Sequence, residues 1–553
     1  MSNQDRRAFW ASTVLYLGIA AFLLRQWLQP GVLPGHANSE APQRLWELHQ
    51  LLRWFSGETP FGHADLIAFP DGRPFWPAMP IADLLMLPMV GALGDALAFS
   101  VVALALLTLA GLGPYVLARG LGARASASFA AGLLLLLNPM MLRNLEDCVL
   151  EMACLGLPCL AAAAMIQVMK GQRRAWIGVF VWTALTAFSS PYFAVFLALA
   201  CLPVAALTWR RWRTWLAIVG VCVAANLSAL LPLALVEGDA GRMGHEGGFV
   251  VAPPPIVYPG GATYRGPTGP HSSTERSDPA KGPQAKPSPL LRVLARWPAG
   301  VLACLGLLLG LGHRKSRPWA VMGIAFFVLG PGVPSLSRAF GQGGQALEGP
   351  LQRLLSGLPL MDVLGNPTRM LLLVSALAAM AWAQLLQHRW PLAIVLALGV
   401  GGELWLLRPD LSLPSRPDPT DVQVVEALSG PYLVVPSGHP PLWMPGLARG
   451  EALLYGGRAQ VPHAYDLGLG QGASDVDAVL ELAVAARLPL AQPIALRGRE
   501  EAVDWARLPQ RQVVVVHAVL EPKQRLELEA ALAPIGRRVV QGAQADLWQL
   551  RDP

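Results

Sequence analysis

Long apolar runs recur along the first three quarters of the chain, and they constrain its fold more than any other feature. A helix that crosses a bilayer core needs about 20 predominantly apolar residues. Only 14% of the 553 residues are charged and 53% are hydrophobic, whereas a water-soluble protein carries about 25% charged residues. The composition therefore excludes a soluble protein and predicts a multi-pass membrane protein with about eleven transmembrane helices. The predicted spans are Phe9–Leu28, Asp95–Ala118, Ser126–Met141, Cys148–Met169, Ala175–Ser189, Tyr192–Trp209, Trp215–Val236, Arg296–Leu311, Trp319–Val333, Met370–Gln387 and Pro391–Leu407.

The loops between these segments alternate in charge, which predicts their sidedness. One set is short and basic, with Asp5 as its only acid, and the positive-inside rule places it in the cytoplasm together with the N-terminus. The other set is longer and acidic, and we expect it outside, at residues 29–78, 142–147, 237–294 and 334–369. The net charge of +7 is thus a topology signal, and no nucleic-acid partner is expected. The basic loops hold Arg6/Arg7, Arg119/Arg124, Lys170/Arg173/Arg174, Arg210/Arg211/Arg213, Arg314/Lys315/Arg317 and Arg389.

The composition changes after residue 407, and this change divides the chain into two predicted domains. Residues 1–407 are expected to form the transmembrane domain. Residues 408–553 are expected to form a soluble α/β domain, which an odd number of spans places on the outer side of the cytoplasmic membrane. The expected fold is mainly α and polytopic, with this extracytoplasmic domain at its C-terminus. The expected strands and helices of that domain are Tyr432–Pro436, Asp475–Arg487, Gln512–His517, Lys523–Ile535, Arg538–Val540 and Asp546–Leu550.

The first outer loop carries the main candidate for chemistry. Leu45, Leu48 and Leu52 recur at helical spacing with neighbouring aromatic residues, up to Phe55, and predict an amphipathic helix on the outer membrane surface. Ser39 is the expected N-cap, and Glu40 falls in the first turn, where a carboxylate complements the helix dipole. This structural role is the alternative to a catalytic role for Glu40.

A shorter apolar stretch, Met79–Leu93, follows this loop. Pro80, Asp83 and Pro88 interrupt it. We therefore expect it to lie on the membrane surface or to re-enter the membrane, and not to cross it.

Several short motifs follow one another in a definite order along most of the chain. They are Glu40, Trp46, Gly57–Pro60, Phe69–Gly72, Leu117–Gly122, Asn138–Arg143, Leu364–Arg369, Val513–His517 and Leu547–Leu550. Their order resembles the GT-C-fold bacterial membrane glycosyltransferases, in particular the group that includes YfhO-like proteins. In that group a first helix leads into a loop with an acidic residue, a Trp-containing helix and a G-x-x-P…P-x-G segment.

The resemblance implies transfer of a sugar, of the hexosyltransferase type, from a polyprenyl-phosphate donor to an envelope glycan, lipid or protein acceptor. Such a reaction uses a carboxylate to deprotonate the acceptor, and cations or a metal to steady the leaving phosphate. By resemblance, Glu40 is the candidate base. His36 stands where these proteins usually have an aspartate, and no second acid adjoins Glu40. His36 is therefore either a substitute acid–base residue or the sign of a non-catalytic protein.

The second outer loop and a late helix supply the candidate substrate-binding residues. Glu146 and Asp147 are adjacent carboxylates near Arg143, and Glu151 lies one turn further on, inside an apolar segment. Ionisable groups at membrane depth are costly and therefore functional candidates, and Asp147 and Glu151 are expected to share a helical face. The alternative is a surface ion pair of Arg143 with either neighbouring acid. Arg369 is expected to bind the lipid phosphate or to extend to lipid headgroups.

The sequence holds no closed set of metal ligands. No cofactor is therefore predicted. The pairs His63/Asp65 and His245/Glu246 have side chains that can bind metals, so a divalent cation stays an open alternative. The absence of a Walker loop argues against an ATP-driven transporter, and the absence of internal repeats argues against an ion-coupled one. The rival function is a non-catalytic envelope-assembly protein or a lipid-linked-glycan transporter with the same membrane body. Membrane lipids are expected partners in either case.

Overall fold

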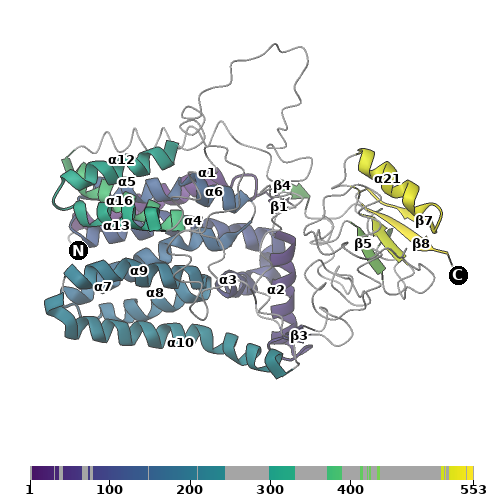
Figure 1. The fold of residues 1–553 in the computed structure, drawn as a ribbon, viewed down its shortest axis with the longest axis horizontal. Helices are drawn as coiled ribbons and strands as arrows, with labels where there is room; N and C mark the ends of the chain where they lie inside the picture. The colour runs from purple at the N-terminus through teal and green to yellow at the C-terminus, as the bar shows by residue number, and fades with distance from the viewer. Residues whose placement is uncertain are drawn as a thin grey trace, which may run out of the picture.

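A bundle of apolar helices makes up most of the described part of the chain (Figure 1). The computed structural model describes residues 3–29, 32–35, 41–64, 73–74, 77, 79–146, 148–207, 209–242, 298–329, 370–388, 412–414, 420, 423–424, 427, 432–435, 512–515, 517, 522–543 and 545–551. The bundle comprises α1 (Asn3–Leu23), α4 (Asp95–Gly120), α5 (Ala125–Leu136), α6 (Pro139–Glu146), the 3-10 helix η1 (Leu150–Leu155), α7 (Gly156–Met169), α8 (Ala175–Ser189), α9 (Pro191–Leu207), α10 (Trp212–Arg242), α12 (Pro298–Gly312), α13 (Arg317–Leu329) and α16 (Met370–Leu385).

Three of the described helical stretches are long and apolar enough to cross a membrane, namely Asp95–Gly120, Leu150–Met169 and Trp212–Ala229. Shorter apolar helices accompany them, so the mainly helical, membrane-type fold expected from the sequence is found. The count of about eleven spans stays a prediction, and the expected span Pro391–Leu407 lies outside the described residues. The expected span Ser126–Met141 is wrong at its end, because α5 stops at Leu136 and Pro139 opens a new helix.

Helix α4 lies at the centre of the bundle, where small residues let backbones approach closely. A Cβ atom added to Gly156 would lie 2.0 Å from the carbonyl oxygen of Leu109, and one added to Gly113 would lie 2.3 Å from the carbonyl oxygen of Gly156. The Tyr16 hydroxyl of α1 donates a 2.8 Å hydrogen bond to the carbonyl oxygen of Phe129 in α5. Close approach of this kind is how helices associate in lipid.

One end of the bundle gathers the basic loops. Lys170 Nζ donates a 2.6 Å hydrogen bond to the carbonyl oxygen of Gly120, the last residue of α4. Arg211 donates to the last carbonyl of α7, and Arg119 pairs with Asp5 near the N-terminus. Lys170 and Arg211 thus satisfy carbonyl groups that helix C-termini leave unpaired. Loops that share a charge pattern in the sequence thus meet at one end.

The opposite end of the bundle carries two short helices, α2 (Ala41–Ser56) and α3 (Pro80–Leu93). Helix α2 runs across this end, at a steep angle to the long helices (Figure 1). Helix α3 has 14 residues. It is therefore about 21 Å long and too short to cross a core of about 30 Å. We call this the α2 end of the bundle.

Two small strand pairs lie beside these helices. Strand β1 (Val32–Pro34) pairs antiparallel with β4 (Ser412–Pro414), and β2 (His63–Ala64) pairs antiparallel with β3 (Arg73–Pro74). The first of these pairs joins the segment that follows α1 to the beginning of the C-terminal part of the chain. Both segments therefore lie on the same side of the bundle.

A four-stranded sheet lies beyond the α2 end (Figure 1). Its order is β5-β6-β8-β7, with β5 parallel to β6 and the other neighbours antiparallel. Strands and helix appear where the sequence predicts them, and the expected helix Asp475–Arg487 lies outside the described residues. That residues 408–553 form one separate domain stays a prediction. The elements are β5 (Tyr432–Val435), β6 (Gln512–Val515), α21 (Pro522–Leu532), β7 (Gly536–Gln541) and β8 (Asp546–Leu550).

Candidate functional site

A charged cluster is buried where α2 packs against α3. Arg44 Nη1 donates a 2.9 Å hydrogen bond to Glu47 Oε2, and both side chains are only 2% exposed. Asp83, in the first turn of α3, is 0% exposed, and neither of its carboxylate oxygens has a hydrogen-bond partner. We call Arg44, Glu47 and Asp83 the α2–α3 charge cluster. Three ionisable groups in such a place are costly unless their charges cancel.

The net charge of the cluster depends on whether Asp83 is protonated. Asp83 belongs to α3, which is too short to span the membrane. Burial raises the pKa of Asp83, and the nearby Glu47 carboxylate raises it further, while the Arg44 guanidinium acts in the opposite direction. The net result is a pKa well above the ordinary value of an aspartate. With Asp83 protonated, Arg44 and Glu47 balance each other and the cluster is neutral.

Two further polar contacts hold α2 in place. His49 Nε2 lies 3.0 Å from Asp95 Oδ2, at the start of α4. Gln50 Nε2 donates a 3.1 Å hydrogen bond to Thr59 Oγ1, just beyond the end of α2. Helix α2 is therefore fixed by polar groups as well as by buried leucines.

The candidate catalytic residues Glu40 and His36 lie outside the described residues, but the chain on both sides of them is described. Strand β1 is held by β4, and Gly35 follows it with a φ of 95°, a conformation that favours glycine. Helix α2 begins at Ala41, which is fully buried. The segment 36–40 thus connects two anchored points.

The candidate residues of the second outer loop are described in part. Arg143 and Glu146 belong to α6, while Asp147 lies outside the described residues. The expectation that Asp147 and Glu151 share one helical face is wrong, because α6 ends at Glu146 and Cys148 takes a φ of 60° before η1 begins. Glu151 is buried within η1.

The remaining candidate, Arg369, also lies outside the described residues. It directly precedes α16, which begins at Met370. Its expected position at the start of a late helix agrees with this boundary, and its proposed contact with a lipid phosphate stays a prediction.

Sequence reasoning missed the α2–α3 charge cluster, although a signal was present. Asp83 is the one charged residue of the apolar stretch Pro80–Leu93. Arg44 and Glu47 lie one turn apart on the same side of α2 as its buried leucines. Phe55, at the end of the expected apolar face of α2, is 66% exposed, and its expected contact with the membrane surface stays a prediction.

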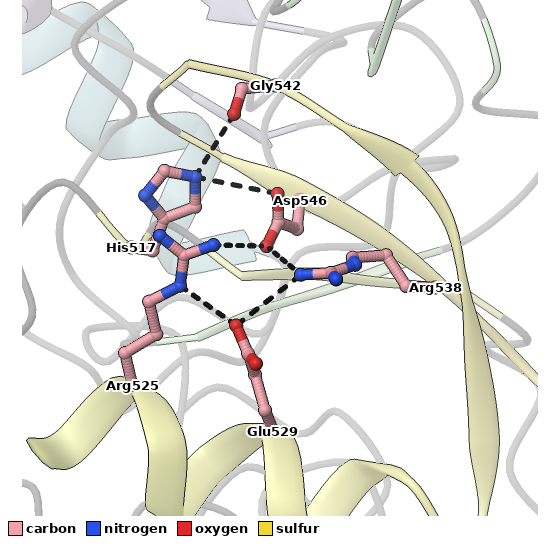
Figure 2. Close-up of polar contacts among 6 residues, drawn as sticks. All are labelled: His517, Arg525, Glu529, Arg538, Gly542 and Asp546. Atoms are coloured by element: carbon pink, nitrogen blue, oxygen red, sulfur yellow. Dashed lines mark hydrogen bonds and ion pairs between the residues drawn. The ribbon is translucent and has the colours of Figure 1, made fainter. Parts of the chain in front are cut away.

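A second polar cluster lies in the C-terminal sheet, around Asp546 at the start of β8 (Figure 2). Arg525 of α21 and Arg538 of β7 approach Asp546 Oδ2 at 3.3 and 3.4 Å, and His517 Nε2 lies 3.5 Å from Oδ1. Glu529 accepts a 2.8 Å hydrogen bond from Arg525 Nε. The network joins α21 to two strands, which indicates a structural role.

The electrostatics of Asp546 agree with that role. Burial by itself would raise the pKa of Asp546, but the adjacent His517 imidazole and the positive charges of Arg525 and Arg538 outweigh this effect. The pKa is therefore lowered, and Asp546 is a carboxylate at neutral pH.

Metal binding finds no support in the part of the chain that the structure describes, where no three His, Cys, Asp or Glu side chains gather into a possible site. Asp65, His245 and Glu246 lie outside that part. A divalent cation therefore stays an untested alternative.

Comparison with known proteins gives a likeness of fold. No protein-family model matches the chain, and no curated protein does. Arabinofuranosyltransferase AftD from Mycobacteria is similar over 99% of this chain and 40% of its own, with a TM-score of 0.58 and 16% identity. A mutant form of AftD matches 97% of this chain and 41% of its own, with a TM-score of 0.53 and 17% identity.

A third similar structure is ArnT from Cupriavidus metallidurans in the apo state. It is matched over 97% of both chains, with a TM-score of 0.47 and 14% identity. The present chain thus spans about two fifths of the length of AftD. At identities this low the likeness concerns the fold alone.

The chain is similar in fold to AftD, whose fold is of the GT-C type. The resemblance inferred from the order of motifs is confirmed at this level. The narrower resemblance to YfhO-like proteins stays a prediction.

Proposed function

We propose that this protein is a membrane glycosyltransferase that moves a sugar from a polyprenyl-phosphate donor to an envelope glycan, lipid or protein acceptor. The reaction takes place at the outer face of the cytoplasmic membrane. The observation that carries the proposal is the likeness to an arabinofuranosyltransferase over 99% of the chain. The sugar of that protein is not carried over to this chain.

The roles of the candidate residues follow from the chemistry of glycosyl transfer. Glu40 deprotonates the acceptor hydroxyl as it attacks the sugar, with His36 beside it in the same segment. Arg369 and Arg143 stabilise the negative charge that builds up on the departing lipid phosphate. Glu146, Asp147 and Glu151 accept hydrogen bonds from sugar hydroxyls.

The geometry at the α2 end supports this assignment. The segment 36–40 joins β1, which β4 holds, to α2, which the charge cluster and His49 hold. A catalytic group needs a rigid scaffold to stay within reach of its proton. The described elements on either side of Glu40, β1 and α2, are each anchored in this way.

The decisive experiment is Glu40→Gln in purified protein reconstituted into nanodiscs. Radiolabelled polyprenyl-phosphate pentoses and hexoses are offered with cell-envelope acceptors, and sugar release is followed. Loss of a general base lowers the rate by about 10²- to 10⁴-fold. Glu58→Gln is the matched control, because Glu58 is an exposed carboxylate of the same loop. Unchanged transfer by Glu40→Gln would overturn the role of Glu40.

The side of the membrane is tested separately by cysteine labelling in intact cells, in a Cys304→Ala background. Lys523→Cys, an exposed position of α21, should react with a membrane-impermeant thiol reagent. Arg173→Cys, in a basic loop, should react only after the membrane is opened. Reversed labelling would place the C-terminal sheet in the cytoplasm.

The second candidate function is a non-catalytic envelope-assembly protein or lipid-linked-glycan transporter. It is favoured by His36 in the place of the usual aspartate. A wild-type protein that binds polyprenyl-phosphate sugars but transfers none of them would support this function and contradict the first.

A further inference from the structure

Asp83 stands apart among the buried polar groups of the α2 end. Arg44 and Glu47 are joined to each other, and His49 is joined to Asp95. Both oxygens of Asp83 are buried without a hydrogen-bond partner. A buried carboxylate without partners is costly, whereas a protonated carboxyl carries no charge.

We infer that Asp83 is a positioning residue, whose proton keeps the α2–α3 charge cluster neutral and thereby holds α2 against α3. Glu40 directly precedes α2 in the sequence, so we expect loss of α2 docking to slow the proposed transfer. This part of the inference rests on the proposed function. Asp83 does not touch substrate in this scheme.

The physical reason is the charge balance of the cluster. With the proton in place, one guanidinium faces one carboxylate. Removing the proton leaves Arg44 facing two carboxylates, Glu47 and Asp83, in a site that excludes water. The buried net charge of the deprotonated cluster weakens the docking of α2 on α3.

The helices packed against α3 show which charged groups determine whether Asp83 is protonated. Helix α3 packs against α2, α4 and α8. The charged groups that act on Asp83 are Arg44 and Glu47, both from α2. Helix α4 contributes Asp95 at its start, which is engaged by His49, and α8 contains no ionisable side chain.

The direction of the pH effect follows from linkage. A carboxyl that holds its proton more tightly when α2 is docked favours docking at low pH. Docking then weakens as the pH rises above the ordinary aspartate value of about 4, towards the raised value. In that window the equilibrium changes by up to about tenfold per pH unit.

The test is hydrogen exchange of the α2 backbone amides in nanodiscs between pH 5 and 9, corrected for the intrinsic rates. In the wild type, α2 protection should fall as the pH rises. Asp83→Asn carries a neutral side chain of the same shape, so its protection should be independent of pH and at least equal to that of the wild type. Asp5→Asn, at the opposite end of the bundle, is the control and should retain the wild-type trend. A wild-type trend in Asp83→Asn, or no trend in the wild type, would overturn the inference.

Transfer kinetics separate this inference from the proposed function. If both hold, Asp83→Asn abolishes the alkaline decline of kcat and leaves KM unchanged, whereas Glu40→Gln is about 10²- to 10⁴-fold slower than the wild type at every pH. If the wild type transfers no sugar but its exchange depends on Asp83, the proposed function fails and the role in docking α2 stands. If transfer occurs and its pH profile and the exchange are both insensitive to Asp83→Asn, the inference fails alone.

Discussion

His49 Nε2 lies 3.0 Å from Asp95 Oδ2, so the middle of α2 is tied to the first residue of α4. Asp95 is also the first residue of α4, where its carboxylate complements the helix dipole. The contact connects the short helix that crosses the α2 end to the central helix of the bundle. It is a direct link between the candidate site and the core.

Replacing His49 by alanine should lower the free energy of unfolding by about 1–3 kcal/mol, because it removes a hydrogen-bond partner from a buried carboxylate. Thermal unfolding in detergent measures the effect. Glu58→Gln breaks only the exposed pair with Arg53 and should cost less than about 1 kcal/mol. Equal unfolding temperatures for the two variants would show that the contact between His49 and Asp95 does not stabilise the fold.

A methyl group at Gly156 should disrupt the packing of α7 against α4. The added Cβ would lie 2.0 Å from the carbonyl oxygen of Leu109, so the two backbones must separate. We expect Gly156→Ala to cost about 1–3 kcal/mol or more. Gly220→Ala in α10 is the matched control, since no atom lies within 4 Å of its Cβ position. The unfolding temperature should fall for Gly156→Ala only, and a tolerated substitution would contradict the close contact.

Acid should loosen the C-terminal sheet through Asp546. Its pKa is lowered in the folded state, so its contribution to stability is present above the unfolded value of about 4 and is lost as the pH falls through the folded value. Hydrogen exchange of α21 and β8 should therefore accelerate below about pH 4. Asp546→Asn should weaken the sheet at neutral pH and remove this acid dependence.

Glu527→Gln serves as the control for that experiment, because its pair with Lys523 is long, at 4.0 Å, and Lys523 is exposed. It should leave the acid dependence unchanged. An acid response that persists in Asp546→Asn would assign it to other carboxylates.

The fold was readable from the sequence to the extent that it depends on local pattern. Runs of apolar residues identify α4, α8 and α16 within a few residues, because bilayer thickness and helical rise impose a length on them. Short apolar runs bounded by polar residues identify β6 and β8 in the tail. The helix break at Cys148 was missed, since a single residue with positive φ changes no hydrophobic pattern.

The candidate site was much less accessible from the sequence. Motif order points to Glu40 and His36, but it cannot show what holds them. Arg44 and Glu47 look like the solvated side of an amphipathic helix until α3 covers them. Asp83 looks like an interruption of an apolar stretch until its neighbours are known.

The sequence by itself determined the class of the protein. Scarce charge and long apolar runs require a membrane, and the position of the basic loops predicts the orientation of the helices, because both follow from the transfer of single residues between water and lipid. Only the tertiary structure decided which ionisable groups are buried together. The burial of Asp83 beside Arg44 and Glu47 depends on where α2 and α3 meet. Asp83 lies 39 and 36 positions further along the chain than these two residues, so no short-range pattern shows that they come together.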